Sequence, residues 1–189
     1  MNRTSIHSAV LAVFCALITP PAVAVTYYVK ADGDDARDGL TDATAWRTLG
    51  QVNEAVIETG ADVMLKSGSS FHQQTLTIDW PGSPSDRVVV GCYYLDPAAG
   101  NRETPCHQGA SAGNVELPEI NGTLESDCRA AANCAYDVAG AVPRSHYDAL
   151  VRISRSHVTV QDLRLRDSAG RGLTADGRSA DSGVISSVT

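Results

Sequence analysis

The chain has 189 residues, of which 43% are hydrophobic and 20% are charged, and its formal net charge is −7. A chain of this length suggests about one domain, with enough apolar residues to bury a core. Its 22 acidic residues outnumber its 15 basic ones, which argues against binding to nucleic acid, because phosphate contacts need a basic surface. With 16 glycines and 8 prolines, the composition is also not that of a low-complexity chain.

The first 24 residues have the organisation of a secretory signal peptide. Arg3 supplies a positive charge, the apolar stretch 11–18 follows, and Ala22-Val23-Ala24 fits the small-x-small cleavage pattern. The apolar stretch is too short to cross a bilayer, which needs about 20 residues, and no later stretch is long and apolar enough. The sequence therefore predicts cleavage after Ala24, a mature chain of residues 25–189 that is secreted or periplasmic, and no membrane span.

Export affects the interpretation of the cysteines. Cleavage removes Cys15 and leaves Cys92, Cys106, Cys128 and Cys134. An even number of cysteines in an exported protein indicates disulfides, and four cysteines allow three pairings. Pairing the first with the second and the third with the fourth is favoured, because each bond closes a short loop between better-patterned segments. Zinc binding is disfavoured, since the ligands lack the C-x-x-C spacing.

The mature chain begins with a predicted strand, a loop and a helix. Thr26–Val29 is rich in β-branched and aromatic residues, which favours a strand. The Asp- and Gly-rich segment that follows is typical of turns. Leu49, Val52 and Val56 then recur at helical spacing, and Gly60 is placed to end the helix. We expect one short amphipathic helix here.

After Gly60 the pattern changes to short apolar or alternating runs separated by turn residues. No helical pattern of ten residues or more lies among them, so doubly wound and (β/α)-barrel folds are disfavoured. The predicted strands cover residues 63–65, 76–78, 88–90, 151–153, 158–160, 163–165 and 184–185.

The last forty residues carry a stronger signal. Val158 and Val160 share one face of a strand, whereas Leu163 and Leu165 have the opposite parity, so the chain must bend at Gln161-Asp162. The apolar pattern also recurs about one repeat later, near residue 184, as in a coil of stacked rungs. An ordinary β-sandwich remains the alternative, because alternating strands and Gly-rich turns serve both folds.

Several segments resemble secreted right-handed parallel β-helix proteins of the pectate and alginate lyase-like superfamily. The N-terminal similarity covers residues 27–49, through Tyr27–Val29, Asp38–Leu40 and Ala43–Trp46. Gly60–Gly68 resembles the first rung of such proteins. Segments that resemble later rungs are Pro118–Gly122, Ser156–Asp167 and Gly170–Gly172.

The resemblance implies an all-β, right-handed parallel β-helix in which a strand and a short capping helix precede the first rung. Residues 25–189 would form the N-terminal part of that domain, with insertions at Leu95–Pro118 and Glu125–His146. About three or four rungs are recognisable, whereas such proteins usually have more, so we expect a fragment without the C-terminal and catalytic rungs. No cofactor is evident, and the resemblance implies calcium only for a full-length protein.

The superfamily includes pectate and alginate lyases, mannuronate epimerases, some glycoside hydrolases and non-catalytic surface proteins. The resemblance therefore implies an exported protein whose partner is an acidic polysaccharide, with lyase-type elimination as the first expectation. Uronate epimerisation and glycoside hydrolysis are alternatives, as is a non-catalytic carbohydrate-binding or cell-surface protein.

Three arginines alternate with apolar residues in the predicted strands, so their guanidinium groups are expected to point away from the core. These are Arg152, Arg164 and Arg166. On an acidic protein such a basic stripe could hold the carboxylates of a polymer through bidentate hydrogen bonds. An ordinary solvated face with nearby aspartates as partners is the alternative.

No catalytic residue can be assigned from the sequence. Elimination from a uronate polymer needs a base and a cation that neutralises the sugar carboxylate. The two lysines, Lys30 and Lys66, lie in the N-terminal segment and the first rung and are not convincing bases. His146 and Tyr147 are candidates, whereas His157 precedes a strand and is expected to be a corner residue.

One loop concentrates acidic residues, namely Asp32, Asp34, Asp35 and Asp38. Carboxylate oxygens are ligands that Ca²⁺ prefers, but the spacing does not match the pattern of an EF-hand loop. Turn chemistry explains these aspartates equally well. Both interpretations stay open at this point.

Overall fold

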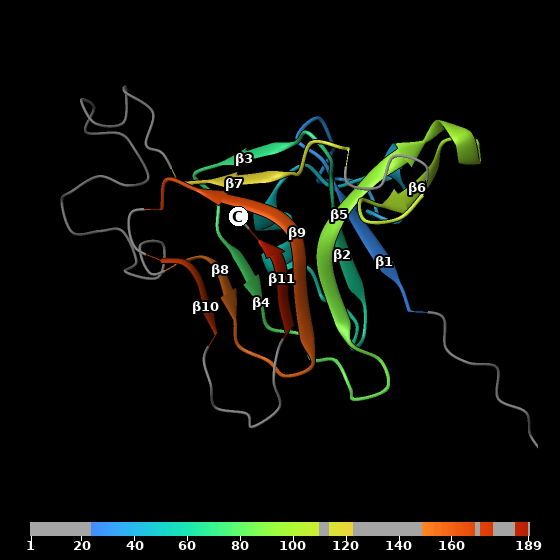
Figure 1. The fold of residues 1–189 in the computed structure, drawn as a ribbon. Coiled ribbons are helices and arrows are strands. Elements are labelled where there is room, and N and C mark those ends of the chain that lie inside the picture. The colour runs from blue at the N-terminus through green and yellow to red at the C-terminus, as the bar shows by residue number, and fades with distance from the viewer. Residues whose placement is uncertain (1–23, 110–113, 123–148, 169–170, 176–183, 189) are drawn as a thin grey trace, which may run out of the picture.

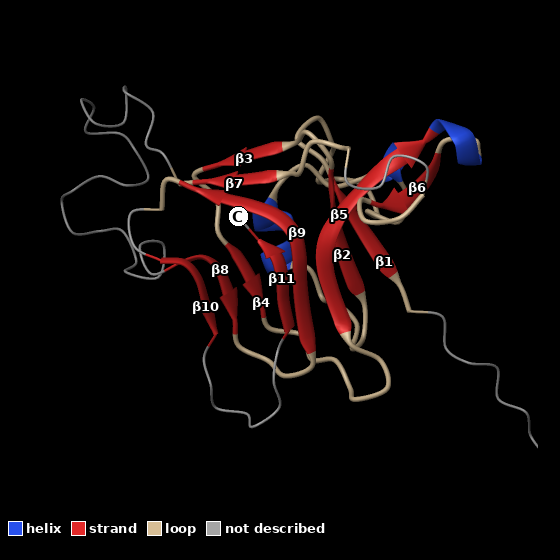
Figure 2. Cartoon of the chain, viewed as in Figure 1, coloured by secondary structure: helices blue, strands red, loops and turns tan. Residues whose placement is uncertain are grey.

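The computed structural model describes residues 24–109, 114–122, 149–168, 171–175 and 184–188. Strands predominate in these ranges, and helix is limited to short segments (Figure 2). No helix within them has the length and apolar character needed to cross a bilayer. Cys128, Cys134, His146, Tyr147 and nearly all of the predicted signal peptide lie outside the described residues.

Five parallel strands lie side by side in the largest sheet (Figure 1). Each pairs in parallel with the strand before it in the row, although the strands are far apart in the sequence. The order in the row is β1 (Thr26–Val29), β2 (Asp62–Lys66), β5 (Val88–Asp96), β9 (Val158–Arg166) and β11 (Val184–Val188).

Between the later strands of the large sheet, the chain forms strands on two other faces of the coil. On one face, β3 (Ser70–His72) pairs in parallel with β7 (Glu119–Asn121), and β7 pairs in parallel with the second half of β9. On the other, β4 (Leu76–Ile78), β8 (Ala149–Ile153) and β10 (Arg171–Ala175) form a parallel sheet. The three groups lie around a common interior (Figure 1), as in a β-helix-like solenoid. Parallel pairing in the described residues rules out the antiparallel sandwich that the sequence left open.

Apolar side chains from equivalent strands are stacked in register inside the coil. Neighbouring strands lie about 4.8 Å apart, so each side chain packs on its counterpart in the next turn of the chain. All the stacked residues belong to one core or pack against it. The three rows are Val63–Val90–Val160, Phe71–Ile120–Leu165 and Leu76–Val151–Leu173.

The predicted bend in the last long strand is confirmed. Asp162 adopts φ of +53°, in the left-handed region that aspartate tolerates better than most residues. The bend lets Val160 and Leu163 both reach the core, although they have opposite parity, and both are fully buried. His157, with φ of +57° directly before β9, is the corner residue that the sequence predicted.

The helix is shorter than predicted. α1 spans Leu49–Glu54, and the side chain of Thr48 caps it by accepting a hydrogen bond from Gln51 N at 3.1 Å. Ala55 has an extended backbone, with ψ of 147°, so the helix ends well before Gly60. The prediction that Val56 belongs to its apolar face was therefore wrong, since that side chain is 93% exposed.

The first predicted insertion contains an antiparallel hairpin. Residues Tyr93–Asp96 at the end of β5 pair with β6 (Arg102–Pro105), and the short helix η2 (Pro97–Ala99) lies between them. A disulfide joins Cys92 to Cys106 across the base of this hairpin, with 5.3 Å between their Cα atoms. This confirms the first of the two predicted disulfide bonds.

Candidate functional site

The structure separates the three predicted arginines. Arg164 and Arg166 lie on β9, in register with Glu119 and Asn121 of β7. Arg152 lies on β8, in a different sheet, between Thr77 and Thr174 of the neighbouring strands. Two of the arginines therefore share one face of the molecule, and the third lies on another.

The face formed by β3, β7 and β9 carries mixed polar groups. Arg166 contacts Glu119 Oε2 at 3.4 Å, and Asn121 Nδ2 donates a hydrogen bond to Glu119 Oε1 at 2.9 Å. His72 Nε2 lies 3.1 Å from Ser70 Oγ on the same face. Because Glu119 already partners Arg166, the positive charge of this face is partly neutralised within the protein.

Aspartate side chains of the acidic loop accept hydrogen bonds from nearby backbone N–H groups. Asp34 Oδ1 accepts from Ala36 N at 3.0 Å, and Asp38 Oδ1 accepts from Leu40 N at 3.0 Å. The backbone hydrogen bond from Ala36 is the main cause that lowers the pKa of Asp34. These contacts are the turn chemistry that the sequence offered as one alternative. Within the described ranges, no three metal-ligating side chains are grouped.

A pocket of about 100 Å³ lies on the outer face of the large sheet, and we call it the sheet pocket. Alternation along β2 creates it, because Val63 and Leu65 point into the core and their neighbours point outward. The hairpin of β5 and β6 forms its wall. The lining residues are Thr26, Tyr28, Asp62, Met64, Tyr93, Glu103 and Pro105.

The two carboxyl groups of the sheet pocket lie in different surroundings. Burial raises the pKa of Asp62; the hydrogen bond from Val89 N (2.7 Å) opposes this, and the charge of Asp86 adds to it. Burial, followed by the charges of Glu103 and Asp62, raises the pKa of the Tyr28 hydroxyl, so both carboxyl groups act on one phenol. A carboxyl group whose pKa is raised by burial is better suited to donate a proton.

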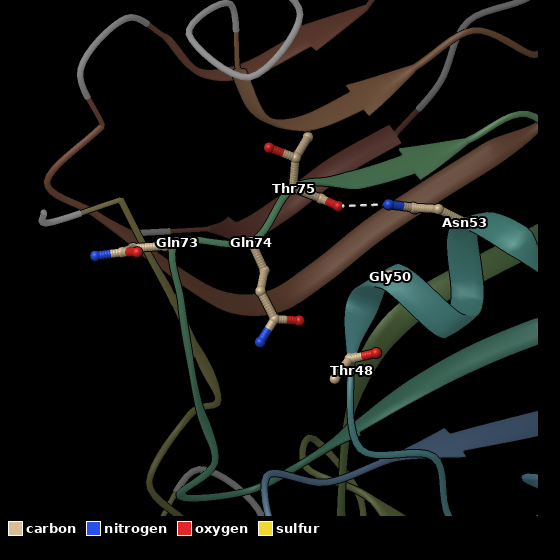
Figure 3. A pocket seen from close by; sticks show the side chains of 6 residues that line it. All are labelled: Thr48, Gly50, Asn53, Gln73, Gln74 and Thr75. Atoms are coloured by element: carbon tan, nitrogen blue, oxygen red, sulfur yellow. Dashed lines mark hydrogen bonds between the residues drawn. The ribbon is translucent and has the colours of Figure 1, made fainter. Parts of the chain in front are cut away.

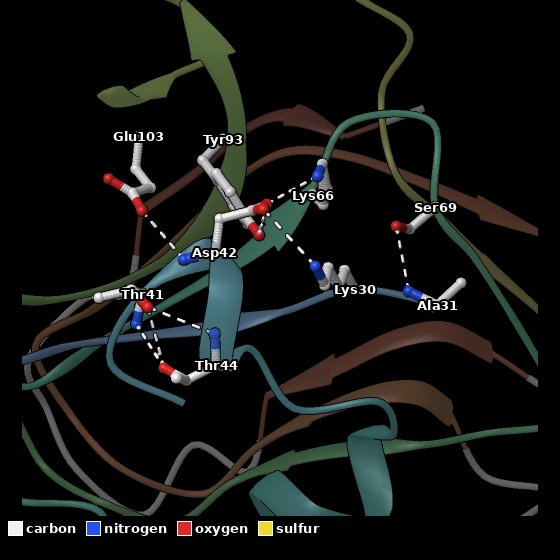
Figure 4. Close-up of polar contacts among 9 residues, drawn as sticks. All are labelled: Lys30, Ala31, Thr41, Asp42, Thr44, Lys66, Ser69, Tyr93 and Glu103. Carbon is white, nitrogen blue, oxygen red and sulfur yellow. Dashed lines mark hydrogen bonds and ion pairs between the residues drawn. The ribbon is translucent and has the colours of Figure 1, made fainter. Parts of the chain in front are cut away.

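A polar network holds Glu103 and Tyr93 in the pocket wall (Figure 4). Asp42, in the short helix η1 (Asp42–Thr44), donates from its backbone N to Glu103 Oε1 at 2.9 Å and accepts from the Tyr93 hydroxyl at 2.9 Å. Lys66 and Lys30 contact its carboxylate at 2.7 Å and 3.5 Å. Both lysines, which the sequence did not favour as bases, therefore help to fix the pocket.

A histidine and an aspartate meet further along the same outer face. On this face Gly91 of β5 lies between Met64 of β2, which lines the sheet pocket, and Gln161 of β9. Beyond it, His107 Nδ1 lies 2.8 Å from Asp162 Oδ2. The sequence predicted the corner that contains Asp162 but not this contact. The disulfide at the residue before His107 was the one signal that pointed to it, because it brings the end of the hairpin back to the sheet.

No protein-family model matches this sequence. The chain is 34% identical to a lacto-N-biosidase from Bifidobacterium longum subsp. longum over 79 residues, which are 40% of this chain. That stretch spans only 5% of the length of the curated relative.

Two solved structures superpose on part of this chain. A GH136 lacto-N-biosidase from Eubacterium ramulus superposes with a TM-score of 0.47 and 20% identity, over 82% of this chain and 21% of the other. A rhamnogalacturonan lyase superposes with a TM-score of 0.46 and 13% identity, over 74% of this chain and 28% of the other.

Proposed function

We propose that this chain forms part of an exported, carbohydrate-active protein of the right-handed parallel β-helix type. The β-helix architecture is supported by the parallel pairing, in one sheet, of strands that are distant in the sequence. The 34% identity to a lacto-N-biosidase over 79 residues supports the substrate class. The predicted signal peptide and the disulfide between Cys92 and Cys106 support export.

From the sequence we expected the catalytic groups to lie in rungs that this chain lacks, whereas we now propose that they lie in the sheet pocket. The observation that carries this proposal is the pair of carboxyl groups, Asp62 and Glu103, that line this pocket. Hydrolysis of a glycosidic bond uses two such groups, one to protonate the leaving oxygen and one to act on the opposite side of the sugar. In this proposal Asp62 donates the proton, since burial raises its pKa, and Glu103 accepts one from the attacking water. The bond from the anomeric carbon to the leaving oxygen breaks, and a bond to the water oxygen replaces it.

A second candidate is lyase-type cleavage of an acidic polysaccharide on the face of β3, β7 and β9. His72 and Arg166 occupy register positions on either side of Asn121, roughly 10 Å apart along the face, so both side chains could reach one uronate. In this candidate Arg164 or Arg166 binds the sugar carboxylate and His72 removes the proton from the adjacent carbon. A carbon–carbon double bond forms as the bond to the glycosidic oxygen breaks, and water protonates the leaving oxygen. The salt bridge between Arg166 and Glu119 at 3.4 Å weighs against it.

The test measures two products from the purified mature chain, residues 25–189, incubated with neutral polysaccharides and with alginate, pectate and chondroitin. Hydrolysis releases reducing ends alone, whereas elimination also creates an ultraviolet-absorbing double bond. We expect reducing ends without the absorbance, lost in Asp62→Asn and Glu103→Gln and retained in Asp79→Asn, which changes an exposed aspartate.

Each other outcome overturns a stated part of the proposal. An absorbing product that His72→Ala abolishes replaces hydrolysis by the second candidate. Binding without any product contradicts catalysis and favours a carbohydrate-binding protein. Neither binding nor product with any polymer contradicts the carbohydrate role itself.

A further inference from the structure

A second and larger cavity, of about 270 Å³, lies where the helix α1 meets the turn between β3 and β4 (Figure 3). We call it the cap pocket. It shares no lining residue with the sheet pocket. Its lining residues are Thr48, Gly50, Asn53, Gln73, Gln74 and Thr75.

The cap pocket is lined by uncharged residues, although the whole chain has 20% charged residues and a net charge of −7. Three of the lining side chains end in carboxamides and two in hydroxyl groups. A carboxamide offers both donors and acceptors, and so does a hydroxyl. Most of the exposed pocket surface is apolar, with these polar groups set among it, and no lining residue can balance a charge. This combination fits a neutral sugar ring, which presents both C–H faces and hydroxyl groups.

Hydrogen bonds hold the side chains of Asn53 and Gln74 in fixed orientations. Asn53 Nδ2 donates to Thr75 O at 2.7 Å, and Asn53 Oδ1 accepts from Thr77 N at 2.8 Å. Gln74 Oε1 accepts from Leu49 N at 2.7 Å. A ligand that binds here therefore does not have to order these side chains, which lowers the entropic cost of binding.

These contacts leave donors for a ligand. Gln74 uses its amide oxygen for Leu49, and within the described residues its Nε2 group has no protein partner. Figure 3 shows the Gln74 side chain extending from the turn toward Thr48, whereas that of Gln73 points away. Gly50 opens the opposite wall, because a Cβ atom there would meet only Thr48 Oγ1, at 3.5 Å.

We propose that the cap pocket binds one residue of a neutral saccharide, with Gln74 Nε2 and the second Nδ2 hydrogen of Asn53 as donors to its hydroxyl groups. This inference rests on the proposed function for the class of ligand. It adds a contact point on a different face from the sheet pocket, so that a glycan chain can be held at a position away from the two carboxyl groups.

The test titrates the mature chain with cellotriose as a neutral probe and trigalacturonate as an acidic one, following side-chain amide signals by NMR. We expect cellotriose to shift the Gln74 and Asn53 amide signals with a Kd of about 1 mM, and trigalacturonate to leave them unchanged. Gly50→Met should fill the pocket, and Gln74→Glu should keep the acceptor for Leu49 N but replace the donor group. Both variants should weaken cellotriose binding by about tenfold or more.

Asp62→Asn is the control, because it changes the other pocket and should leave these shifts intact. Gly50→Met adds a good helix former at an exposed position, so loss of binding there does not come from unfolding. Cellotriose binding that both variants leave unchanged contradicts the cap pocket alone. Shifts at Gln74 without hydrolysis of any polymer contradict the proposed reaction alone, and the absence of binding by every saccharide contradicts both.

Discussion

Asp42 connects three segments that are distant in the sequence. Its carboxylate contacts Lys30 at 3.5 Å, Lys66 at 2.7 Å and the Tyr93 hydroxyl at 2.9 Å. Burial raises the pKa of Asp42, but the hydrogen bonds from Lys66 and Tyr93 and the charges of both lysines outweigh it, so the net pKa is lowered. Burial, followed by the charge of Asp42, raises the pKa of Tyr93.

Removing the charge of Asp42 should destabilise the protein. In Asp42→Asn, Lys30 and Lys66 lose their ionised partner while remaining largely buried, with 15% and 27% of their side chains exposed. We expect the free energy of unfolding to fall by about 2 kcal/mol, measured by urea denaturation. Asp79→Asn, at an exposed aspartate, is the control and should change it by less than about 0.5 kcal/mol. Equal values for the two variants would contradict the role of the network.

The lowered pKa of Asp42 predicts that its contribution to stability depends on pH. The pKa of Asp42 is lower in the folded protein than its ordinary value of 3.8, so its stabilising contribution is present above that value and is lost as the pH falls through the lowered pKa. The difference in unfolding free energy between the wild type and Asp42→Asn should therefore be constant from about pH 7 to 5 and shrink below about pH 4. A difference that grows on acidification would contradict this assignment.

The hairpin of β5 and β6 is the element that shapes the candidate site. Its β6 strand supplies Glu103 to the sheet pocket, and the residue after its disulfide, His107, reaches Asp162 at 2.8 Å. The bond between Cys92 and Cys106 spans 14 residues of sequence and ties the hairpin to the large sheet. The sequence predicted this disulfide and an insertion, but not an antiparallel pairing inside it.

Removal of this disulfide should loosen the hairpin without unfolding the coil. The double variant Cys92→Ala/Cys106→Ala should lose about 3 kcal/mol of stability, as expected for a loop of this length. It should also change the imidazole NMR signals of His107, because the contact with Asp162 depends on the hairpin end. Unchanged His107 signals in the variant would show that the disulfide does not position this pair.

Individual elements were predictable where a local pattern was strong. The strand Thr26–Val29 appears with the predicted bounds, and β2, β4 and β8 include the predicted apolar runs. β3 and β6 were missed, because β3 has only three residues with one apolar side chain, Phe71, and β6 is polar. Both owe their extended conformation to pairing with neighbours. The predicted helix was too long for a related reason. Val56 fits the helical spacing, but its side chain is exposed and does not pack on the core.

At the scale of the whole molecule, stability depends on the stacked interior rows. Ile120 is fully buried between Phe71 and Leu165 in register, so Ile120→Ala should leave a cavity and lower the unfolding free energy by about 3 kcal/mol. Val56→Ala is the control: the sequence placed Val56 in the apolar pattern of the helix, but its side chain is exposed, so the variant should change stability by less than about 0.5 kcal/mol. Comparable losses in both variants, measured by urea denaturation, would contradict the stacked core.

The candidate site was much less predictable than the fold. Alternation along a strand correctly placed Arg164 and Arg166 outside the core, because the period of two is a local property. The sheet pocket instead brings together Asp62 and Glu103, which are 41 positions apart, through a parallel pairing and a hairpin. No spacing in the sequence encodes that both residues line one pocket, since this depends on how the turns of the coil are stacked.

The coil requires that successive turns of the chain lie next to each other in parallel register. Methyl NOE measurements on the mature chain test this most directly, since neighbouring strands lie about 4.8 Å apart. The register predicts NOEs that connect Val63 to Val90 and Val90 to Val160, with weak or no signal directly between Val63 and Val160. Assigned spectra without the first two contacts, or with NOEs that pair β2 and β5 in antiparallel order, would contradict it.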